Sequence, residues 1–497
     1  MRQSAHKIFV NTLLLTAASL VMRGVGLIFQ VYLAGKIGAS SIGVYSLIMS
    51  VYTMFVTLGS GGIRFAVTRL TAAAISENDS VRRTVGSSLV YSLCTGLLSL
   101  SALFFAAPLI GGRWIGAAEV IPALKILSLS LPFIAVTAVF GGYFTGVERV
   151  VRSVSVNILE QLSRIAVTVV LLNLSGGMGI RGICASLAVA ATLGEVVSCV
   201  CHVLLFAIDI RRFPRTAPKG GYGKKIFGTA MPIAVSAYMR TGLSSLGHIL
   251  IPRGLRASGA SFESAFAAYG AIHGMAFPVL LFPSALLTAL AELIIPRLTA
   301  AQSEGSQRGI NYMSTRVIKI GLMFSVCVGG IMLFFGPELG AAVYGGNEVG
   351  RYLRIFAPLV PVMYCDMVTD GCLKGLGQHM KAMYINIAEA TLNVLLLYIL
   401  VPRLAVLGYG LSIYICESFN LALSFGRLLK VARVEIGPSE LLRIILASAG
   451  AGFGVRLLGL GLVSSILAAV AAYIALLCVL GVIADSDMDW LWRVVRN

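Results

Sequence analysis

Three arginines lie inside stretches of sequence that are otherwise apolar enough to cross a membrane. Arg23 interrupts AASLVMRGVGLIFQVYLA, Arg64 follows the glycine-rich GSGG, and Arg240 lies in a third such stretch. An arginine at the centre of a membrane helix costs about 2.5–3.5 kcal/mol on insertion scales, which the protein must recover by pairing it or by lining a wet cavity. Because a guanidinium group holds phosphate through two parallel hydrogen bonds, the three residues predict a cavity for an anionic, phosphate-bearing ligand. His273, in a fourth apolar stretch, is expected to line the same cavity.

A structural interpretation of these arginines stays open. Each could bond backbone carbonyl groups or a distant acid, and Arg64 could extend its long side chain to the membrane interface. No acid lies in the stretches that contain the three arginines, so any neutralising acid must come from another part of the chain.

Acidic side chains lie deep in other apolar stretches. Glu160 with Arg164, and Asp370 with Lys374, are four residues apart and could form ion pairs along one helix face. The remaining deep acids could bind a coupling ion, Na⁺ or H⁺, or serve the scaffold by hydrogen bonding between helices. The candidates for either role are Glu160, Asp366, Asp370 and Glu389.

No pattern of catalytic or metal-binding residues stands out. The chain has no nucleophile elbow, HExxH or CxxC pair, and its nine cysteines lie almost all in apolar runs. The stretch GGYGKK at Gly220 resembles a phosphate-binding loop but lacks the spacing and the following Ser or Thr. We therefore expect no enzyme, no metal site, no resident cofactor and no ATP-driven pump.

The elements that must position these residues are membrane helices. Of the 497 residues 58% are hydrophobic and 12% charged, against roughly 25% charged in soluble domains, and the mean hydropathy is +0.90. The sequence predicts an all-α integral membrane protein with about fourteen spans. They are expected near 8–34, 41–71, 85–110, 120–146, 153–175, 180–208, 226–252, 262–296, 316–336, 350–375, 382–402, 405–429, 440–459 and 462–483.

The cations behind the net charge of +18 are distributed as the positive-inside rule describes. This explains the charge better than binding of nucleic acid does. Most cations fall in alternate connections, which an even number of spans places on one side together with both termini. We expect both termini in the cytoplasm and the protein in a cytoplasmic membrane.

The two halves of the chain repeat one another. GYFTGVERVVRSVSVNILE from Gly142 matches GCLKGLGQHMKAMYINIAE from Gly371 without a gap, at an offset of 371 − 142 = 229 residues. The repeat predicts two lobes of six helices, the layout of transporters in which two bundles alternate in access. The expected parts are an N-terminal lobe at 1–210, a cytoplasmic linker at 211–225, a C-terminal lobe at 226–430, two further helices at 440–483 and a cytoplasmic tail at 484–497.

Two blocks resemble a known family. RGVGLIFQVYLAGKIGASSIGVYSLIMSVYTMFVTLGSGGIRFAVTRLTAA and AAYGAIHGMAFPVLLFPSALLTALAELIIPRLTAA are similar to the SpoVB-like polysaccharide biosynthesis proteins of the MATE/MurJ/Wzx (MOP) flippase superfamily. The resemblance implies a V-shaped fold around a central cavity. It also implies flipping of an undecaprenyl-pyrophosphate-linked saccharide, lipid II or a related polysaccharide unit, across a bacterial membrane by a monomer in contact with membrane lipids.

The resemblance also implies roles for single residues. In the lipid II flippase branch, arginines on the first, second and eighth helices hold the pyrophosphate. Arg23 and Arg64 match the first two positions, whereas the eighth helix here carries His273, and Arg240 on the seventh is the expected substitute. The two helices beyond the repeat are expected to form a groove for the lipid tail.

Two alternatives stay open at this point. A MATE-type cation-coupled drug antiporter has the same fold and is favoured by Asp366 and Asp370 on one helix. A membrane glycosyltransferase or ligase would need a sizeable loop with carboxylates or histidines, whereas the longest loops, Arg211–Lys225 and Arg297–Lys319, are basic.

Overall fold

The computed structural model describes residues 2–174, 179–213 and 220–483, and helices are the only regular secondary structure within them. The predicted all-helical membrane fold is confirmed. Part of the predicted linker, 214–219, and the predicted tail, 484–497, lie outside the described residues.

The number of spans differs from the prediction. In the described part of the chain, nine helices are long and apolar enough to cross a membrane, or eleven if each of two bent helix pairs is one span. The expected count of fourteen is not confirmed. One reason is that two long helices each cover two predicted spans and are broken only at single residues, Gly38 (φ 77°) and Ala405 (φ 49°). The predicted spans 226–252 and 440–459 form helices that are not among the nine.

The contacts divide the chain into two compact units. Unit 1 comprises Met1–Gly43 and Ser258–Asn497, and unit 2 comprises Val44–Ala257. The lobe boundaries expected from the repeat stay a prediction, because this grouping exchanges one helix for another. The first predicted span belongs with the second repeat, and the helix that starts the second repeat belongs with the first.

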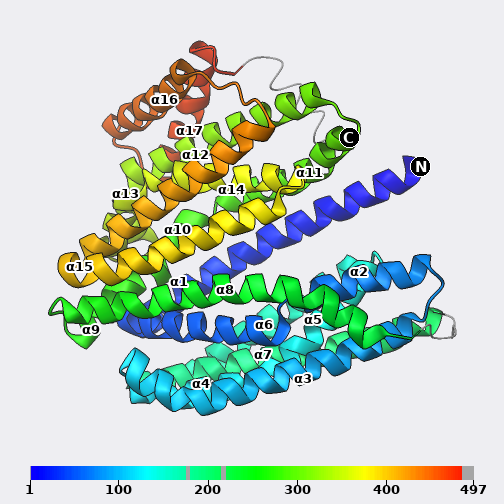
Figure 1. The fold of residues 1–497 in the computed structure, drawn as a ribbon. Helices are drawn as coiled ribbons and strands as arrows, with labels where there is room; N and C mark the ends of the chain where they lie inside the picture. The colour runs from blue at the N-terminus through cyan, green and yellow to red at the C-terminus, as the bar shows by residue number, and fades with distance from the viewer. Residues whose placement is uncertain (1, 175–178, 214–219, 484–497) are drawn as a thin grey trace. The chain divides into compact units, whose positions relative to one another are not determined.

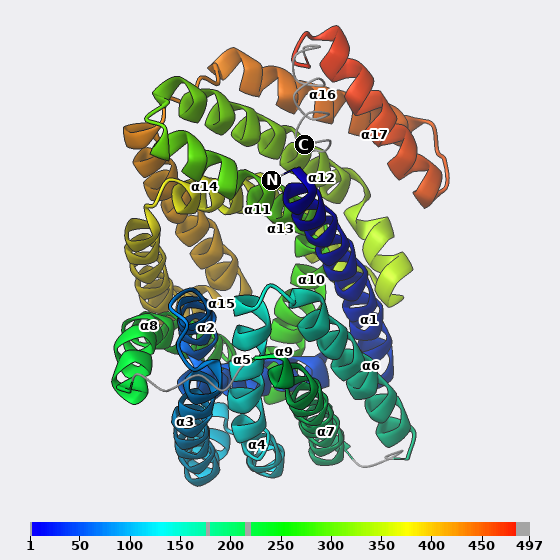
Figure 2. The same cartoon turned by 90° about the vertical axis from the view of Figure 1, so that its right-hand side faces the viewer.

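In unit 2 the buried core lies between α2, α3 and α5, and α8 packs against α2 and α3 (Figures 1 and 2). After the second half of α1 (Arg2–Ser60), its elements are α2 (Ile63–Ser76), α3 (Val81–Leu109), the π-helix η1 (Ile110–Ile115), η2 (Ala118–Val120), α4 (Ile121–Ser128), α5 (Leu131–Gly146), α6 (Val150–Leu174), α7 (Gly179–Asp209), η3 (Ile210–Arg212) and α8 (Tyr222–Ala257).

Unit 1 contains the first part of α1 and all elements after Ala257. These are α9 (Phe262–Tyr269), the π-helix η4 (Gly270–Ala276), α10 (Phe277–Leu281), α11 (Ser284–Ser303), α12 (Gln307–Tyr344), α13 (Asn347–Phe356), α14 (Leu359–Gly375), α15 (His379–Val431), α16 (Pro438–Leu457) and α17 (Leu462–Val479). In Figure 2, α16 and α17 lie side by side next to α12.

Glycines at matching positions of the repeat perform the same task in each unit. A Cβ atom at Gly142 would lie 2.6 Å from the Arg64 carbonyl oxygen, so only glycine lets α5 come this close to α2. A Cβ atom at Gly371 would lie 2.8 Å from Cβ of Ala291, where α14 packs on α11. The repeat found in the sequence is therefore a repeat of helix packing.

Two ion pairs attach α16 to α12. The Lys319 ammonium lies 2.7 Å from the Glu440 carboxylate near one end of α16, and Arg456 lies 3.3 Å from Glu338 near the other. Between them, the Tyr473 hydroxyl of α17 donates to the Met323 carbonyl oxygen of α12 at 2.9 Å. The two helices beyond the repeat are thus an integral part of unit 1.

Candidate functional site

The structure brings the helices of Arg23 and His273 together in unit 1. Gln30 lies seven residues after Arg23, so both side chains project from the same face of α1. The Gln30 side chain donates to the Gly274 carbonyl oxygen at 2.7 Å, one residue beyond His273. Arg23 is exposed, and it forms no hydrogen bond or ion pair with a side chain that the structure describes.

Pro278 explains this contact. In a regular α-helix the carbonyl of residue 274 would accept a hydrogen bond from the N–H of residue 278, which proline does not have. Gln30 supplies the missing donor from α1. A proline within the apolar stretch therefore fixes how α1 lies against the segment that carries His273.

His273 lies in the π-helix η4, a wide helical turn of a kind frequent at functional sites. Its ring stacks on Tyr269, with the ring centres 5.4 Å apart and the planes at 14°, and lies 6.1 Å from the ring of Phe277. Tyr269 is fully buried, whereas His273 is half-buried. The imidazole thus contacts two aromatic rings and is partly accessible.

The structure brings the helices of Arg64 and Arg240 together in unit 2. The predicted break before Arg64 is present: Gly62 has a φ of 72°, and α2 begins at the next residue. A Cβ atom at Gly62 would lie 2.3 Å from the Ala230 carbonyl oxygen, so the break lets α2 contact α8 closely. Arg64 and Arg240 are both exposed on these two helices, and among the described residues neither forms an ion pair.

The acids of unit 1 face one another across α14 and α15. Asn420 donates to Asp366 Oδ2 at 2.8 Å, and both residues are more than nine-tenths buried. Asn386 donates to Asp370 at 3.4 Å, and Lys374 lies 3.8 Å from the same carboxylate, which confirms the predicted Asp370–Lys374 pair. The Oδ1 atoms of Asp366, Asp370 and Asn420 are buried, and none of them has a hydrogen-bond partner among the residues that the structure describes.

Two further acids join this group from α15. Glu389 and Glu417 both interact electrostatically with Asp366. Among the described residues, four acids therefore share one region of unit 1 with Lys374, which is exposed, forms an ion pair with Asp370 and also interacts electrostatically with Asp366. In chemical terms the region can accept a proton or a small cation.

The acids of unit 2 are arranged differently. Glu160 on α6 and Glu195 on α7 both interact electrostatically with Arg164, which lies between them. The close packing that this needs is possible at Gly194, where a Cβ atom would lie 3.2 Å from Cβ of Arg164. The expected direct ion pair between Glu160 and Arg164 is not formed among the described residues; one arginine serves two glutamates instead.

Sequence reasoning missed a third charged cluster. Asp209 is fully buried and accepts hydrogen bonds from Arg149, from Arg152 at 2.6 Å and from the Tyr143 hydroxyl at 3.0 Å. Arg212 lies 3.9 Å away. The available signal was a lone acid at the end of an apolar stretch, two residues before a pair of arginines.

Family models match most of the chain. The model described as "Polysaccharide biosynthesis protein" matches residues 8–302, and the model described as "MatE" matches residues 262–399. Stage V sporulation protein B of Bacillus subtilis (strain 168) is 25% identical over 420 residues, which cover 81% of this chain and 80% of the relative. Lipid II flippase MurJ of the same organism is 21% identical over 413 residues, which cover 76% and 74%.

Solved structures share the fold. A structure titled as lipid II flippase MurJ, inward closed conformation, has a TM-score of 0.73 at 13% identity and covers 98% of this chain and 100% of its own. An inward-facing multidrug resistance MATE family transporter of the MOP superfamily has a TM-score of 0.65 at 17% identity, with 83% and 95% covered. At these identities the likeness concerns the fold alone.

Proposed function

The chain belongs to the polysaccharide biosynthesis protein family, as its resemblance predicted, and on that premise we propose that it is a flippase. Its cargo is an undecaprenyl-pyrophosphate-linked saccharide, either lipid II or a related polysaccharide unit, moved by alternating access. The named relatives are a flippase, a sporulation protein and transporters, which supports a role other than catalysis.

The observation that carries this proposal is the state of the arginines. Arg23 and Arg64 lie in the candidate span Ser19–Ser76 and Arg240 lies in α8, yet each is exposed and forms no ion pair with a described side chain. An unpaired guanidinium at membrane depth needs a wet surface or an anionic ligand. A pyrophosphate offers the geometry that guanidinium groups bind in pairs. We assign His273 a contact with the saccharide or the phosphate, because its ring is partly accessible beside Arg23's helix.

We assign the acids of unit 1 to coupling. The unpaired Oδ1 atom of buried Asp366, with Asp370 and Glu389 near it, offers a site for Na⁺ or H⁺. Such a site would supply the energy of a gradient, since the chain has no motif for ATP hydrolysis. Glu160 is assigned to the scaffold, because Arg164 already compensates its charge.

The proposal is tested by lipid binding in native mass spectrometry. Purified protein is titrated with lipid II and with undecaprenyl pyrophosphate, as wild type and as Arg23→Ala, Arg64→Ala and Arg240→Ala. We expect each substitution to weaken binding about tenfold, because a charge-assisted hydrogen bond to phosphate contributes about 1.5–3 kcal/mol. Arg308→Ala removes an exposed arginine in the first turn of α12 and should bind like wild type.

Two results would overturn the assignment. One is that neither lipid binds to wild type at concentrations that saturate a known flippase. The other is that the three variants bind as well as Arg308→Ala, in which case the arginines are structural. Arg23→Lys separates the two contributions of the residue, because lysine keeps the charge and loses the paired donors.

A cation-coupled drug antiporter is the second candidate. It is favoured by the acidic region of unit 1, which falls largely within the residues matched by the MatE model. Reconstituted protein that expels ethidium along a Na⁺ or H⁺ gradient, and loses this activity in Asp366→Asn, would favour this candidate. Movement of lipid II across the membrane of the same vesicles, without movement of ethidium, would favour the flippase.

We further propose that both termini face the cytoplasm of a bacterium and that the protein acts as a monomer among membrane lipids, without nucleic acid. The distribution of cations supports this orientation. Alkaline phosphatase fused after Arg496 should be inactive, whereas fusion within the connection at 403–404 should be active. The reverse pattern would invert the topology.

A further inference from the structure

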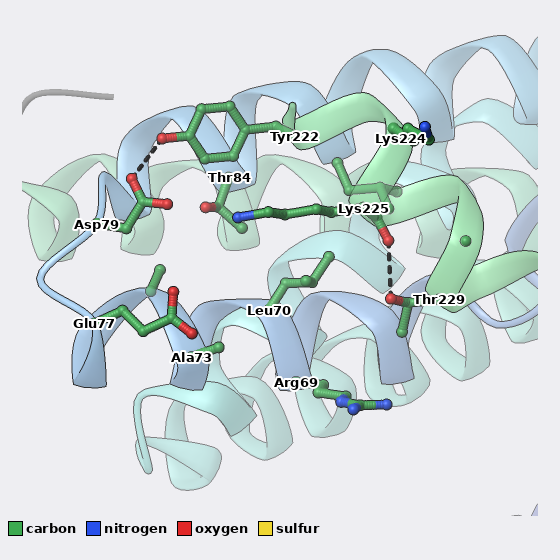
Figure 3. A pocket seen from close by; sticks show the side chains of 13 residues that line it. Arg69, Leu70, Ala73, Glu77, Asp79, Thr84, Tyr222, Lys224, Lys225 and Thr229 are labelled. Carbon is green, nitrogen blue, oxygen red and sulfur yellow. Dashed lines mark hydrogen bonds between the residues drawn. The ribbon is translucent and has the colours of Figure 1, made fainter. Parts of the chain in front are cut away.

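A charged cavity lies in unit 2, and Arg23, Arg64 and Arg240 are not among the residues that line it. It has a volume of about 400 Å³ and lies between the end of α2, the start of α3 and the first turns of α8. Its charged lining residues are Arg69, Lys224, Lys225, Glu77 and Asp79. Figure 3 shows Lys225 extending across the cavity toward Tyr222 and Asp79, with Lys224 at the upper right and Arg69 at the lower side.

The cations exceed the acids that are available to them. Asp79 is buried and already accepts hydrogen bonds at 2.6 Å from the Tyr222 hydroxyl and from the Ser80 N–H. The Lys225 ammonium lies 6.0 Å from the centre of the Tyr222 ring. Three cations therefore face Glu77 and an Asp79 that is engaged elsewhere, which leaves a positive cavity.

The backbone at the same place is suited to an anion. Gly220 and Gly221 both have positive φ, at 84° and 72°, and lead directly into α8. Lys225 donates its N–H to the Gly221 carbonyl, and the amides ahead of it in the first turn have no acceptor within the helix. Amides at a helix start and in such glycine turns favour phosphate. GGYGKK thus supplies backbone donors and two lysines at one place, although it is no nucleotide-binding loop.

A stripe of apolar side chains follows Lys224 along the same side of α8. Phe227, Met231 and Val235 follow one another at intervals of four residues, and each is at least a third exposed. Their spacing puts them on one side of the helix. A positive pocket at the end of an exposed apolar stripe fits an amphiphile with a phosphate head group and a hydrocarbon tail.

We propose that this cavity binds the phosphate of an anionic phospholipid head group, held by Lys224, Lys225 and Arg69, with the hydrocarbon along the α8 stripe. The site is separate from the cargo site proposed above and does not depend on it. A soluble phosphate ester has the same anionic group, so the experiment must distinguish the two sources.

The test uses the full chain in detergent and counts retained phosphatidylglycerol by native mass spectrometry. Lys224→Gln with Lys225→Gln should lower retention roughly tenfold or more, since each lysine contributes to attraction of an anionic head group. Lys381→Gln with Lys430→Gln removes the same charge from exposed positions outside the cavity and should retain as much lipid as wild type. Glu77→Gln should raise retention, because it removes a negative charge from the wall.

The outcomes separate clearly. Loss in the cavity variant alone, unaffected by millimolar glycerol phosphate, supports a lipid site. Competition by glycerol phosphate at the same concentration as the lipid supports a phosphate site with a soluble source. Equal loss in both double variants, or no loss together with no gain in Glu77→Gln, overturns the proposal. Unchanged melting temperatures show that each variant is folded.

Discussion

The two repeats place acids at matching positions but balance their charge in different ways. At the repeat offset, Glu160 of unit 2 corresponds to Glu389 of unit 1, and Arg164 corresponds to Asn393. Arg164 interacts with both glutamates near it. The side-chain amide oxygen of Asn393 is instead buried and has no hydrogen-bond partner among the described residues. The same helical scaffold therefore carries a compensated cluster in one unit and an uncompensated one in the other.

Residues of α14, which packs against α15, increase this difference in charge between the units. Asp366 and Asp370 correspond at the same offset to Thr137 and Gly141. Unit 1 thus has two carboxylates where unit 2 has a hydroxyl and a glycine, and it has an asparagine in place of the arginine. The comparison teaches that one pattern of helix packing can carry a compensated acid cluster in one unit and a candidate cation site in the other.

At a second matched position the side chain donates hydrogen bonds in one unit and accepts them in the other. Arg149, which bonds buried Asp209 in unit 2, corresponds to Gln378 in unit 1. Gln378 instead accepts hydrogen bonds from Arg427 at 3.2 and 2.6 Å. The first contact connects the start of α6 to the end of α7 through a buried carboxylate. The second connects the start of α15 to the end of this broken helix through a neutral amide.

The largest effect is expected at the buried carboxylate. Asp209→Ala should lower the free energy of unfolding by about 3 kcal/mol, because it leaves several arginines without their acid. Gln378→Ala, at the matched contact, should cost about 1 kcal/mol. Denaturant unfolding in detergent measures both. Equal losses would contradict the distinction between the two contacts.

The next effect concerns the repeated glycines. Gly142→Ala brings a Cβ atom within 2.6 Å of backbone oxygen on α2, and should destabilise unit 2 by about 2 kcal/mol. Gly371→Ala meets the side chain of Ala291 at 2.8 Å and should cost less, about 1 kcal/mol. Melting temperatures of the two variants rank them, and a larger loss in Gly371→Ala would refute the ranking.

A smaller effect is expected on the acid cluster. Asn393→Arg makes unit 1 resemble unit 2. It should lower the apparent affinity of transport for the coupling cation about tenfold, because a fixed cation now lies near the acids. Asn393→Gln keeps the neutral amide and serves as the control. Transport by reconstituted protein is measured over a range of Na⁺ concentration and pH. A variant as active as the control would show that the cluster has no coupling role.

The smallest effect is expected from the exposed lysine of this cluster. Lys374 lies 3.8 Å from Asp370 but is 47% exposed, so Lys374→Gln should change the free energy of unfolding by no more than about 0.5 kcal/mol. A loss of several times that size would mean that Lys374 balances the whole acid group.

Part of the fold could be predicted from the sequence, because that part depends on local composition. Apolar runs predicted the membrane helices, the gapless match predicted the repeat, and the glycines before Arg64 predicted the break in helix. The number of spans was harder, since Ala405 breaks a helix with no glycine or proline at that residue. A non-glycine residue with positive φ is held by its surroundings, which sequence does not display.

Contacts between distant residues were beyond the sequence. Asp209 meets Arg149 and Arg152 across about sixty residues, and its partners are decided by how α5, α6 and α7 pack. The exchange of one helix between the two repeats was also not predictable, because equivalent helices have equivalent apolar faces. The candidate arginines could be named from the sequence, but which of them are neighbours could not.

The contact between Gln30 and Gly274 has a consequence for how variants of this chain combine. Gln30 donates to a carbonyl oxygen that cannot accept a hydrogen bond from the N–H of residue 278, because that residue is proline. An alanine at 278 would offer an N–H there, and we expect the loss of Gln30 to cost less in that background. The two positions are therefore epistatic: the harm done by losing one depends on the residue at the other, although 248 positions (278 − 30) separate them along the chain.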